Sequence, residues 1–525
     1  MPGGIMQLVF YGAEDLYLTG NPSISFFRSV YRRHTQFGME YIPLYFDPLP
    51  SFTATQDTMA TVKIDRNAEL LYDTYLVYDL PALFTNNQIP VGWVEEIGCK
   101  IIKEITIRAD GTVLDTQRGD FIKVYSDLTL PTDQKAKFIS LVGGEQFMQN
   151  SGRNLVNDIN KQQIGIQARR LYIPLFFWFC RNSGLAFPLV ATQYNQIFID
   201  VRFSSLNELI RIGNPLISPK RLFGDYSNSD QNVAIRNYLM FGNTQGVNNG
   251  RTIFDQNNVF FYFTQNNWQS NTYLLANYIF LGDDERTQIA QTSREYLMTQ
   301  TQYYLYQGLR QGPNTIEMTL NHPVSEIMWY LTRDDLDLSN DWYNFSGYNN
   351  PQSMQWIQDQ YQDYNFDFST TQASTSNKIP DLQYIDQLTP YVNSVKAQSV
   401  DKIANINLQT YFGNYYRIMS KMKPIFNNND RMAEEDDSFY QNLQVYKYHK
   451  GAGHLGLYAL SFAVDPESPI QPSGTTNFSR LNSQELFVTV DPTYPIEQSF
   501  NMYLYAVNWQ VMRVMGGIIA PVFAN

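Results

Sequence analysis

Two widely separated stretches of the chain carry the same succession of apolar, turn-forming and apolar positions. In residues 456–490, every second position from Tyr458 to Val464 is apolar, which is the period of a strand with one buried face. The alternation stops at Asp465-Pro466, because each proline in this region fixes φ and removes a hydrogen-bond donor. It resumes at residues 486–490. The stretch therefore predicts a strand, a long stiffened loop and a second strand.

Residues 171–203 repeat this arrangement. An apolar run at residues 171–180 predicts a strand, Asn182-Ser183-Gly184 and Pro188 predict the loop, and residues 197–203 alternate again. Two copies at so long a spacing indicate two copies of one β domain rather than a solenoid, whose repeats are far shorter.

The other segments predict a β protein with a few interruptions. Asp110-Gly111, between alternating residues, is the strongest hairpin signal in the chain. Residues 121–149 lose the strand period and predict a helical excursion. Residues 209–267, rich in Asn, Gly, Ser and Asp, predict a connector before a strand at 273–281, and the polar residues 346–377 predict a long outer loop.

The first 25 residues predict an arm rather than part of a core. Flanking glycines and the turn at Gly20-Asn21-Pro22 prevent a sustained period, yet six side chains are too apolar to remain in water. We expect these side chains to be buried by a partner during assembly. They are Ile5, Met6, Leu8, Val9, Phe10 and Tyr11.

Composition excludes several classes of protein. The 525 residues allow two to four domains, and 43% hydrophobic with 15% aromatic residues suits pleated, half-buried surfaces. A net charge of −12 argues against direct binding of nucleic acid, which requires clustered Lys and Arg. The apolar runs are shorter than the roughly 20 residues of a membrane-spanning helix. Cys99 and Cys180 are expected to be reduced, buried thiols, although one bridge between them is compatible with the sequence.

No candidate motif supports catalysis, a cofactor or a metal. Gly451, Gly453 and Gly456 match G-x-G-x-x-G, but a strand pattern follows where a phosphate site needs a helix. The four histidines and two cysteines lack metal-ligand spacing. Asn344 and Asn477 head acceptor sequons, which are candidate glycosylation sites if the chain meets the modifying machinery.

Five blocks resemble, in family order, the major capsid proteins of nucleocytoplasmic large DNA viruses. They are GGIMQLVFYGAEDLYLTGNPSISFFRSVYRRHTQFGMEY at 3–41, LFFWFCRNSGLAFPL at 175–189, LANYIFLGDDER at 275–286, NHPVSEIMWY at 321–330 and QPSGTTNFSRLN at 471–482. With the repeated strand pattern, they predict an all-β chain of two tandem eight-stranded antiparallel jelly-roll sandwiches with short helices and long surface loops. The expected divisions are an N-terminal arm at 1–25, a first jelly roll at 26–208, a connector with an extended loop at 209–267 and a second jelly roll at 268–525.

The resemblance implies a structural role without a reaction. Three such chains make a homotrimeric, pseudo-hexagonal capsomer, which tiles the outer shell of a large icosahedral double-stranded DNA virus. The implied partners are neighbouring capsomers and minor capsid proteins beneath the shell, with an internal membrane nearby and no direct contact with nucleic acid. The implied location is the virion, assembled in the cytoplasm of the infected cell. The arm would lie at the capsomer base.

An alternative function follows from the fold class alone. Two-domain β-sandwich proteins also bind or cleave carbohydrates, because a fold does not fix a function. A glycosidase needs two carboxylates flanking a cleft. A screen for sugar binding and glycoside hydrolysis separates the two interpretations.

Overall fold

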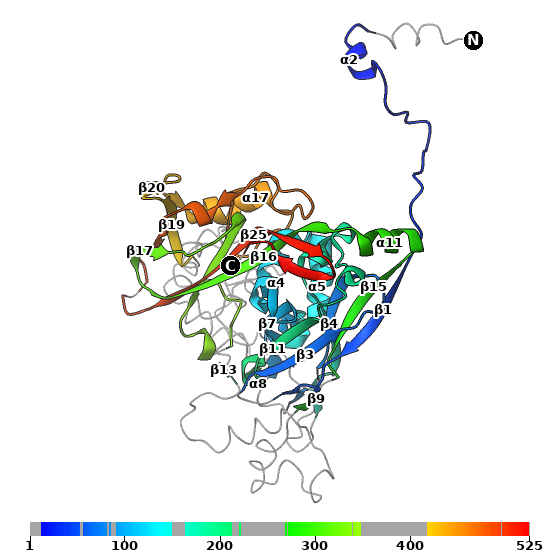
Figure 1. Ribbon diagram of the computed structural model, residues 1–525. Helices are drawn as coiled ribbons and strands as arrows, with labels where there is room; N and C mark the ends of the chain where they lie inside the picture. The colour runs from blue at the N-terminus through cyan, green and yellow to red at the C-terminus, as the bar shows by residue number, and fades with distance from the viewer. Residues whose placement is uncertain are drawn as a thin grey trace, which may run out of the picture.

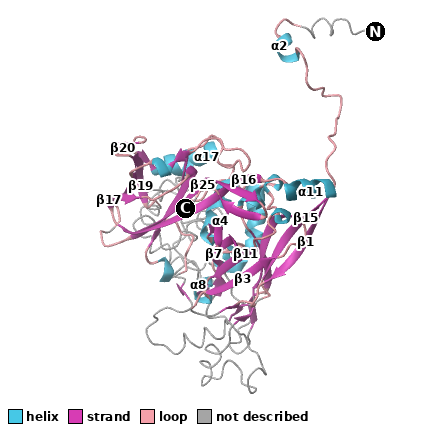
Figure 2. Cartoon of the chain, viewed as in Figure 1, coloured by secondary structure: helices cyan, strands magenta, loops and turns pink. Residues whose placement is uncertain are grey.

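The computed structural model of the protein describes residues 12–52, 56–80, 83–85, 91–149, 163–212, 220–221, 268–269, 271–338, 340–347, 417–494 and 496–523. In these residues the chain forms antiparallel sheets arranged as two sandwiches, with short helices between them (Figures 1 and 2). The arm residues Ile5, Met6, Leu8, Val9, Phe10 and Tyr11 lie outside the described residues, as do 213–219 and 222–267 of the predicted connector and 348–377 of the predicted outer loop.

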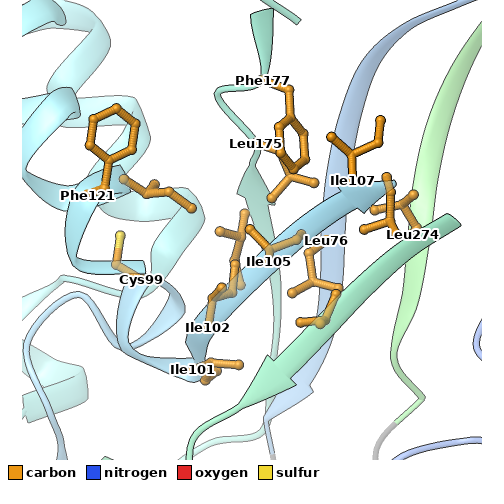
Figure 3. Close-up of a cluster of buried hydrophobic side chains, with 14 of the residues drawn as sticks. Leu76, Cys99, Ile101, Ile102, Ile105, Ile107, Phe121, Leu175, Phe177 and Leu274 are labelled. Carbon is orange, nitrogen blue, oxygen red and sulfur yellow. The ribbon is translucent and has the colours of Figure 1, made fainter. Parts of the chain in front are cut away.

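The first sandwich contains two four-stranded sheets. One has the order β1 (Phe37–Tyr45), β15 (Tyr273–Leu281), β4 (Leu70–Leu80), β10 (Arg169–Pro174). The other has the order β3 (Thr58–Ile64), β11 (Ile197–Phe203), β7 (Ile102–Ala109), β8 (Thr112–Gln117). Alternate residues face inward, so Leu76 and Leu274 from one sheet share a buried cluster with Ile105 and Ile107 from the other (Figure 3).

The second sandwich contains the corresponding pair of sheets. One has the order β16 (Arg294–Leu309), β25 (Phe500–Met515), β18 (Pro323–Arg333), β22 (Leu457–Ser461). The other has the order β17 (Gly312–Glu317), β24 (Gln484–Val490), β19 (Met419–Phe426), β20 (Asn429–Asp430). Trp329, Leu486 and Leu504 lie in the buried cluster between them.

The two sandwiches have identical topology. Numbered along the chain within each sandwich, the eight strands have the order 1-8-3-6 in one sheet and 2-7-4-5 in the other. The two return stretches are the β10–β11 and β22–β24 connections, which join the sixth and seventh strands in both cases. The predicted pair of jelly rolls is therefore confirmed.

Helices interrupt both sandwiches at the same place, between the fifth and sixth strands. In the first they are α4 (Gly119–Thr129), α5 (Thr132–Val142) and α6 (Gln146–Gln149), which confirms the predicted helical excursion. In the second, η4 (Phe439–Leu443) continues into α17 (Gln444–Tyr448). Among the described residues, no helix is both long and apolar enough to cross a membrane.

Shorter elements complete the fold. The strands are β2 (Ser51–Phe52), β5 (Leu83–Thr85), β6 (Val91–Trp93), β9 (Gln163–Ile166), β12 (Ile210–Ile212), β13 (Lys220–Arg221), β14 (Trp268–Gln269), β21 (Glu435–Asp436), β23 (Thr476–Asn477) and β26 (Ile518–Pro521). The helices are α2 (Asp15–Thr19), α3 (Ile97–Ile101), α7 (Trp178–Arg181), α8 (Leu206–Leu209), α11 (Asp283–Gln291) and the single turns η1 (Ser183–Leu185), η2 (Leu189–Ala191), η3 (Leu336–Leu338) and η5 (Phe478–Arg480).

The structure corrects the predicted start of the second jelly roll. The sequence places 268–281 there, but β14 pairs with β2, and β15 pairs with β1 and β4 in the first sandwich. The reason is that β15 fills the gap between two strands whose hydrogen-bonding edges would otherwise lack partners. The second sandwich therefore begins after Leu281.

The two return strands are also shorter than predicted. β10 ends at Pro174 and is followed by α7, and β22 ends at Ser461 rather than Val464. Proline lacks the donor that would continue the ladder, and the aromatic residues after it close the end of the sandwich, where Phe177 and Trp178 are buried.

Candidate assembly surfaces and the interdomain junction

The two sandwiches are joined by a buried aromatic junction. The outer face of the β16-β25-β18-β22 sheet packs on α4, where the rings of Phe121 and Tyr505 are 5.6 Å apart. Tyr330 and Tyr505 belong to the same buried cluster as the core of the first sandwich. The Arg118 guanidinium lies 4.3 Å from the centre of the Tyr303 ring. Such extensive burial makes the two sandwiches one packed unit rather than two loosely tethered domains.

The G-x-G-x-x-G motif forms part of this junction. The Gly451 N–H donates to the carbonyl oxygen of Leu128 at 2.7 Å, and the Gly453 N–H donates to that of Asp127 at 3.0 Å. These carbonyls lie at the end of α4, where helix carbonyls lack partners within the helix. Gly456 adopts φ +76°, a conformation that favours glycine. The glycines therefore allow a close backbone contact between the two sandwiches, and β22 follows them directly.

Four charged side chains form a compact cluster under α4. Lys123 Nζ lies 2.8 Å from Glu96 Oε1 and 3.0 Å from Asp127 Oδ2, and these three side chains are only 3–4% exposed. Lys135 Nζ lies 2.7 Å from Asp127 Oδ1 and 3.3 Å from Glu96 Oε1. Burial acts to raise the pKa of Asp127, but the two lysines outweigh it and lower the net pKa. Sequence reasoning missed this cluster, because buried ion pairs have no periodic signal.

A second buried group surrounds His449, whose side chain is 1% exposed. Its Nε2 lies 3.5 Å from Glu326 Oε2 and its Nδ1 lies 3.4 Å from Glu467 Oε1. Burial lowers the pKa of His449, but Glu467 and Glu326 outweigh burial and raise the net pKa above its ordinary value of 6.5. Burial also raises the pKa of Glu326. The two carboxylates thus favour the charged form of His449.

We expect this group to make folding stability depend on pH. Because the folded-state pKa of His449 is raised, its contribution is complete below about pH 6.5 and is lost as pH rises through the folded pKa. The free energy of unfolding should therefore fall as pH rises above about 6.5, and His449→Gln should flatten that fall. Urea titrations at several pH values measure it, with His34→Gln in the exposed arm as the control. An unchanged pH slope in His449→Gln would contradict the assignment.

One polar pocket of about 220 Å³ lies between β8 and β16. Asp115 is the one carboxylate among its lining residues, beside Gln300, Gln302 and Tyr304. Burial raises the pKa of Asp115 to about 6, and its carboxylate accepts a hydrogen bond from the Thr301 N–H at 3.1 Å. A glycosidase needs two carboxylates. This lining therefore gives no support to the carbohydrate alternative.

The cysteines and the sequons have different surroundings. Cys99 is a buried free thiol and Cys180 a partly buried one, and burial raises the pKa of Cys180 to about 12. Asn344 is 2% exposed and donates to Asp341 at 2.8 Å, so its amide is inaccessible to a glycosyltransferase in the folded chain. Asn477 is exposed on β23, and its modification stays a prediction. Within the described part of the chain, no group of three or more His, Cys, Asp and Glu could hold a metal ion.

The described part of the arm projects away from both sandwiches (Figure 1). It continues beyond the predicted boundary at residue 25, because β1 begins only at Phe37. α2 buries none of its residues. Large apolar side chains along this segment are exposed, namely Leu16, Tyr17, Leu18, Ile24, Phe26, Phe27, Val30 and Tyr31. In the isolated chain these side chains are exposed to water, which is typical of a segment that binds a partner.

Two tandem sandwiches of identical strand order, packed through one face, define a double jelly-roll protein. Residues 25–282 match the model for the N-terminus of major capsid proteins, and residues 285–520 match the model for the major capsid protein of large eukaryotic DNA viruses. The chain belongs to this family of viral major capsid proteins, and its function is that of a structural capsid protein.

Individual relatives align with this chain over its full length. The major capsid protein of Phaeocystis pouchetii virus is 28% identical, and that of Paramecium bursaria Chlorella virus 1 is 25% identical, each with 100% of both chains covered. The fold matches the quasi-atomic model of the PBCV-1 virus capsid with a TM-score of 0.62 at 21% identity, covering 95% of this chain and 100% of the other. It also matches the Faustovirus major capsid protein with a TM-score of 0.60 at 12% identity, covering 96% and 94%.

Proposed function

We propose that three copies of this major capsid protein form a homotrimeric capsomer that tiles the outer shell of an icosahedral double-stranded DNA virus. The observation that carries the proposal is the identical strand order of the two sandwiches. Three chains would supply six similar lobes, and a closed ring of six lobes has the outline of a hexagon. Closed cyclic symmetry also buries matching surfaces without leaving an unsatisfied end.

The trimer is tested by light scattering on the purified protein. The expected mass is three times the chain mass of 60.8 kDa. A stable monomer at micromolar concentration would overturn the proposal. Electron microscopy of the same material at higher concentration tests for hexagonal outlines and for tiling.

The proposed partners of the capsomer are neighbouring capsomers and minor capsid proteins beneath the shell. We place the shell near an internal membrane and its assembly in the host cytoplasm. The supporting observation is the row of exposed apolar side chains from Leu16 to Tyr31, which would be covered on the inner side of the shell. Direct contact with the genome is disfavoured, since 50 acidic residues outnumber 38 basic ones.

We divide the described chain into the arm up to Gln36, a first jelly roll up to Leu281 and a second jelly roll beyond it.

Deletion of residues 1–21 should leave a folded trimer but prevent or distort shell formation. None of the described residues of the deleted segment is buried, so the melting temperature should change little. Each apolar side chain buried by a partner contributes roughly 1.5 to 3 kcal/mol, which is enough in sum to bias assembly. Calorimetry measures the first effect and electron microscopy the second. Loss of the trimer would make the arm part of the jelly roll, and normal particles would make it dispensable.

A further inference from the structure

The outer face of the β1-β15-β4-β10 sheet is rich in aromatic residues. Leu44, Leu274, Leu76 and Ile173 pair across the four strands and fill the core, so the neighbouring row, one residue along each strand, points outward. The outward residues that we call the aromatic face are Met39, Tyr41, Tyr45, Tyr75, Tyr172 and Tyr273.

The aromatic face is open to solvent in the single chain. Tyr41 and Tyr45 are 52% and 64% exposed, and their rings lie 6.4 Å from Tyr75 and 5.6 Å from Tyr273. Clustered aromatic rings on a sheet are a common feature of interfaces, because they bury much area at low entropic cost. Few monomeric proteins leave such a surface uncovered.

The second sandwich shows how an equivalent face is covered. By strand order, β16-β25-β18-β22 corresponds to β1-β15-β4-β10. Its outer face is also tyrosine-rich, with Tyr303 and Tyr505 rings 5.3 Å apart. This face is covered within the chain by α4, through the contact of Phe121 with Tyr505. Thus the helix between the fifth and sixth strands of one sandwich covers the outer face of the next.

The corresponding helix of the second sandwich is only partly covered. It consists of η4 and α17, where Val445 packs inward while Leu443 and Tyr446 are 51% and 87% exposed. Lys447 beside them is exposed as well. The aromatic face carries a carboxylate of opposite charge in Asp73, which is half-buried beside Tyr75. One end of the chain therefore presents an uncovered face, and the other presents an uncovered helix.

In Figure 1 the elements that carry these two surfaces lie apart, with α17 at the top of the two sandwiches and β1 at their right edge. This inference rests on the proposed trimer: we infer that the helical segment formed by η4 and α17 of one subunit, through Leu443 and Tyr446, binds the aromatic face of the next subunit. The contact between subunits then repeats the contact between α4 and Tyr505 within a subunit. A head-to-tail contact of this kind forms a closed ring, and three chains supply six such contacts, three within chains and three between them.

Charge substitutions test each surface separately. Tyr446→Glu and Tyr41→Glu should each abolish the trimer at micromolar concentration and leave a monomer with an unchanged circular dichroism spectrum. Met59→Glu is the matched control, since Met59 is 71% exposed on β3 in the opposite sheet, and it should remain trimeric. A wild-type monomer would refute the trimer itself. A wild-type trimer that survives both substitutions would refute only the inferred interface.

Cross-linking tests the pairing of the two surfaces. In a Cys180→Ala background, mild oxidation of the Tyr41→Cys/Tyr446→Cys double variant should give a covalent trimer, whereas each single variant should give none. Met59→Cys/Tyr446→Cys is the control and should also give none. Covalent dimers from Tyr41→Cys alone would show that two aromatic faces meet each other and would overturn the inference.

The arm is the competing occupant of the aromatic face, because it leads directly into β1. Deletion of residues 1–21 in the double-cysteine variant separates the two cases. Cross-linking should persist without the arm if α17 is the occupant. Cross-linking that is absent with the arm and appears only after its deletion, while light scattering reports a trimer in both variants, would assign the face to the arm.

Discussion

Gly451→Ala should greatly lower the stability of the chain and uncouple its two sandwiches. A Cβ atom at this position would lie 2.3 Å from the carbonyl oxygen of Asp127 and 2.5 Å from that of Leu128. Both are backbone atoms at the end of α4, so no flexible side chain can move aside. The glycine motif at 451–456 must shift, which breaks the hydrogen bonds donated by Gly451 and Gly453. Each buried polar group left without a partner costs about 1 to 3 kcal/mol.

Urea unfolding followed by tryptophan fluorescence and by circular dichroism measures this effect. The wild-type chain should unfold in one transition, and Gly451→Ala should show a lower midpoint and separate transitions for the two sandwiches. Gly111→Ala is the matched control, since a Cβ there meets nothing within 4 Å. If Gly451→Ala unfolds at the wild-type midpoint, the glycine motif at 451–456 contributes nothing to the stability of the junction.

Lys123→Met should destabilise the first sandwich by about 3 to 5 kcal/mol, because it leaves two buried carboxylates with one partly exposed cation. Glu96 and Asp127 each contact both lysines, and Lys135 alone cannot neutralise them at this burial. Denaturant unfolding measures the loss. Lys137→Met on the exposed surface of α5 is the control, with an expected change within about 0.5 kcal/mol.

A second substitution distinguishes lost charge from lost packing. If the uncompensated charge is the cause, Glu96→Gln should recover part of the stability in the Lys123→Met background, although it lowers stability in the wild-type background. Such non-additivity is expected for groups in one network. Additive effects of Lys123→Met and Glu96→Gln would contradict the network.

Local sequence patterns were sufficient to predict the elements whose structure depends on neighbouring residues. The Asp110-Gly111 turn forms the predicted β7–β8 hairpin, with Asp110 at φ 49°. The return stretches form strands around stiffened loops because alternation and proline act within a few residues. Their repetition predicted two sandwiches of one kind. The arm was recognisable because its apolar residues follow neither the period of a strand nor that of a helix.

The sequence by itself thus determined two β domains of one topology, the helical excursion and an apolar arm. Only the tertiary structure decided that Tyr273–Leu281 belongs to the first sandwich, because its partner β1 is more than two hundred residues away and any edge strand could have paired with it. It also decided that Lys123 and His449 are buried among carboxylates, and that Gly451 touches the end of α4. The contact of Gly451 with α4 depends on the packing of one sandwich on the other, whereas the β15 pairing and the two buried charge clusters form within a single sandwich. In each case the fold brings together residues with no shared pattern along the chain.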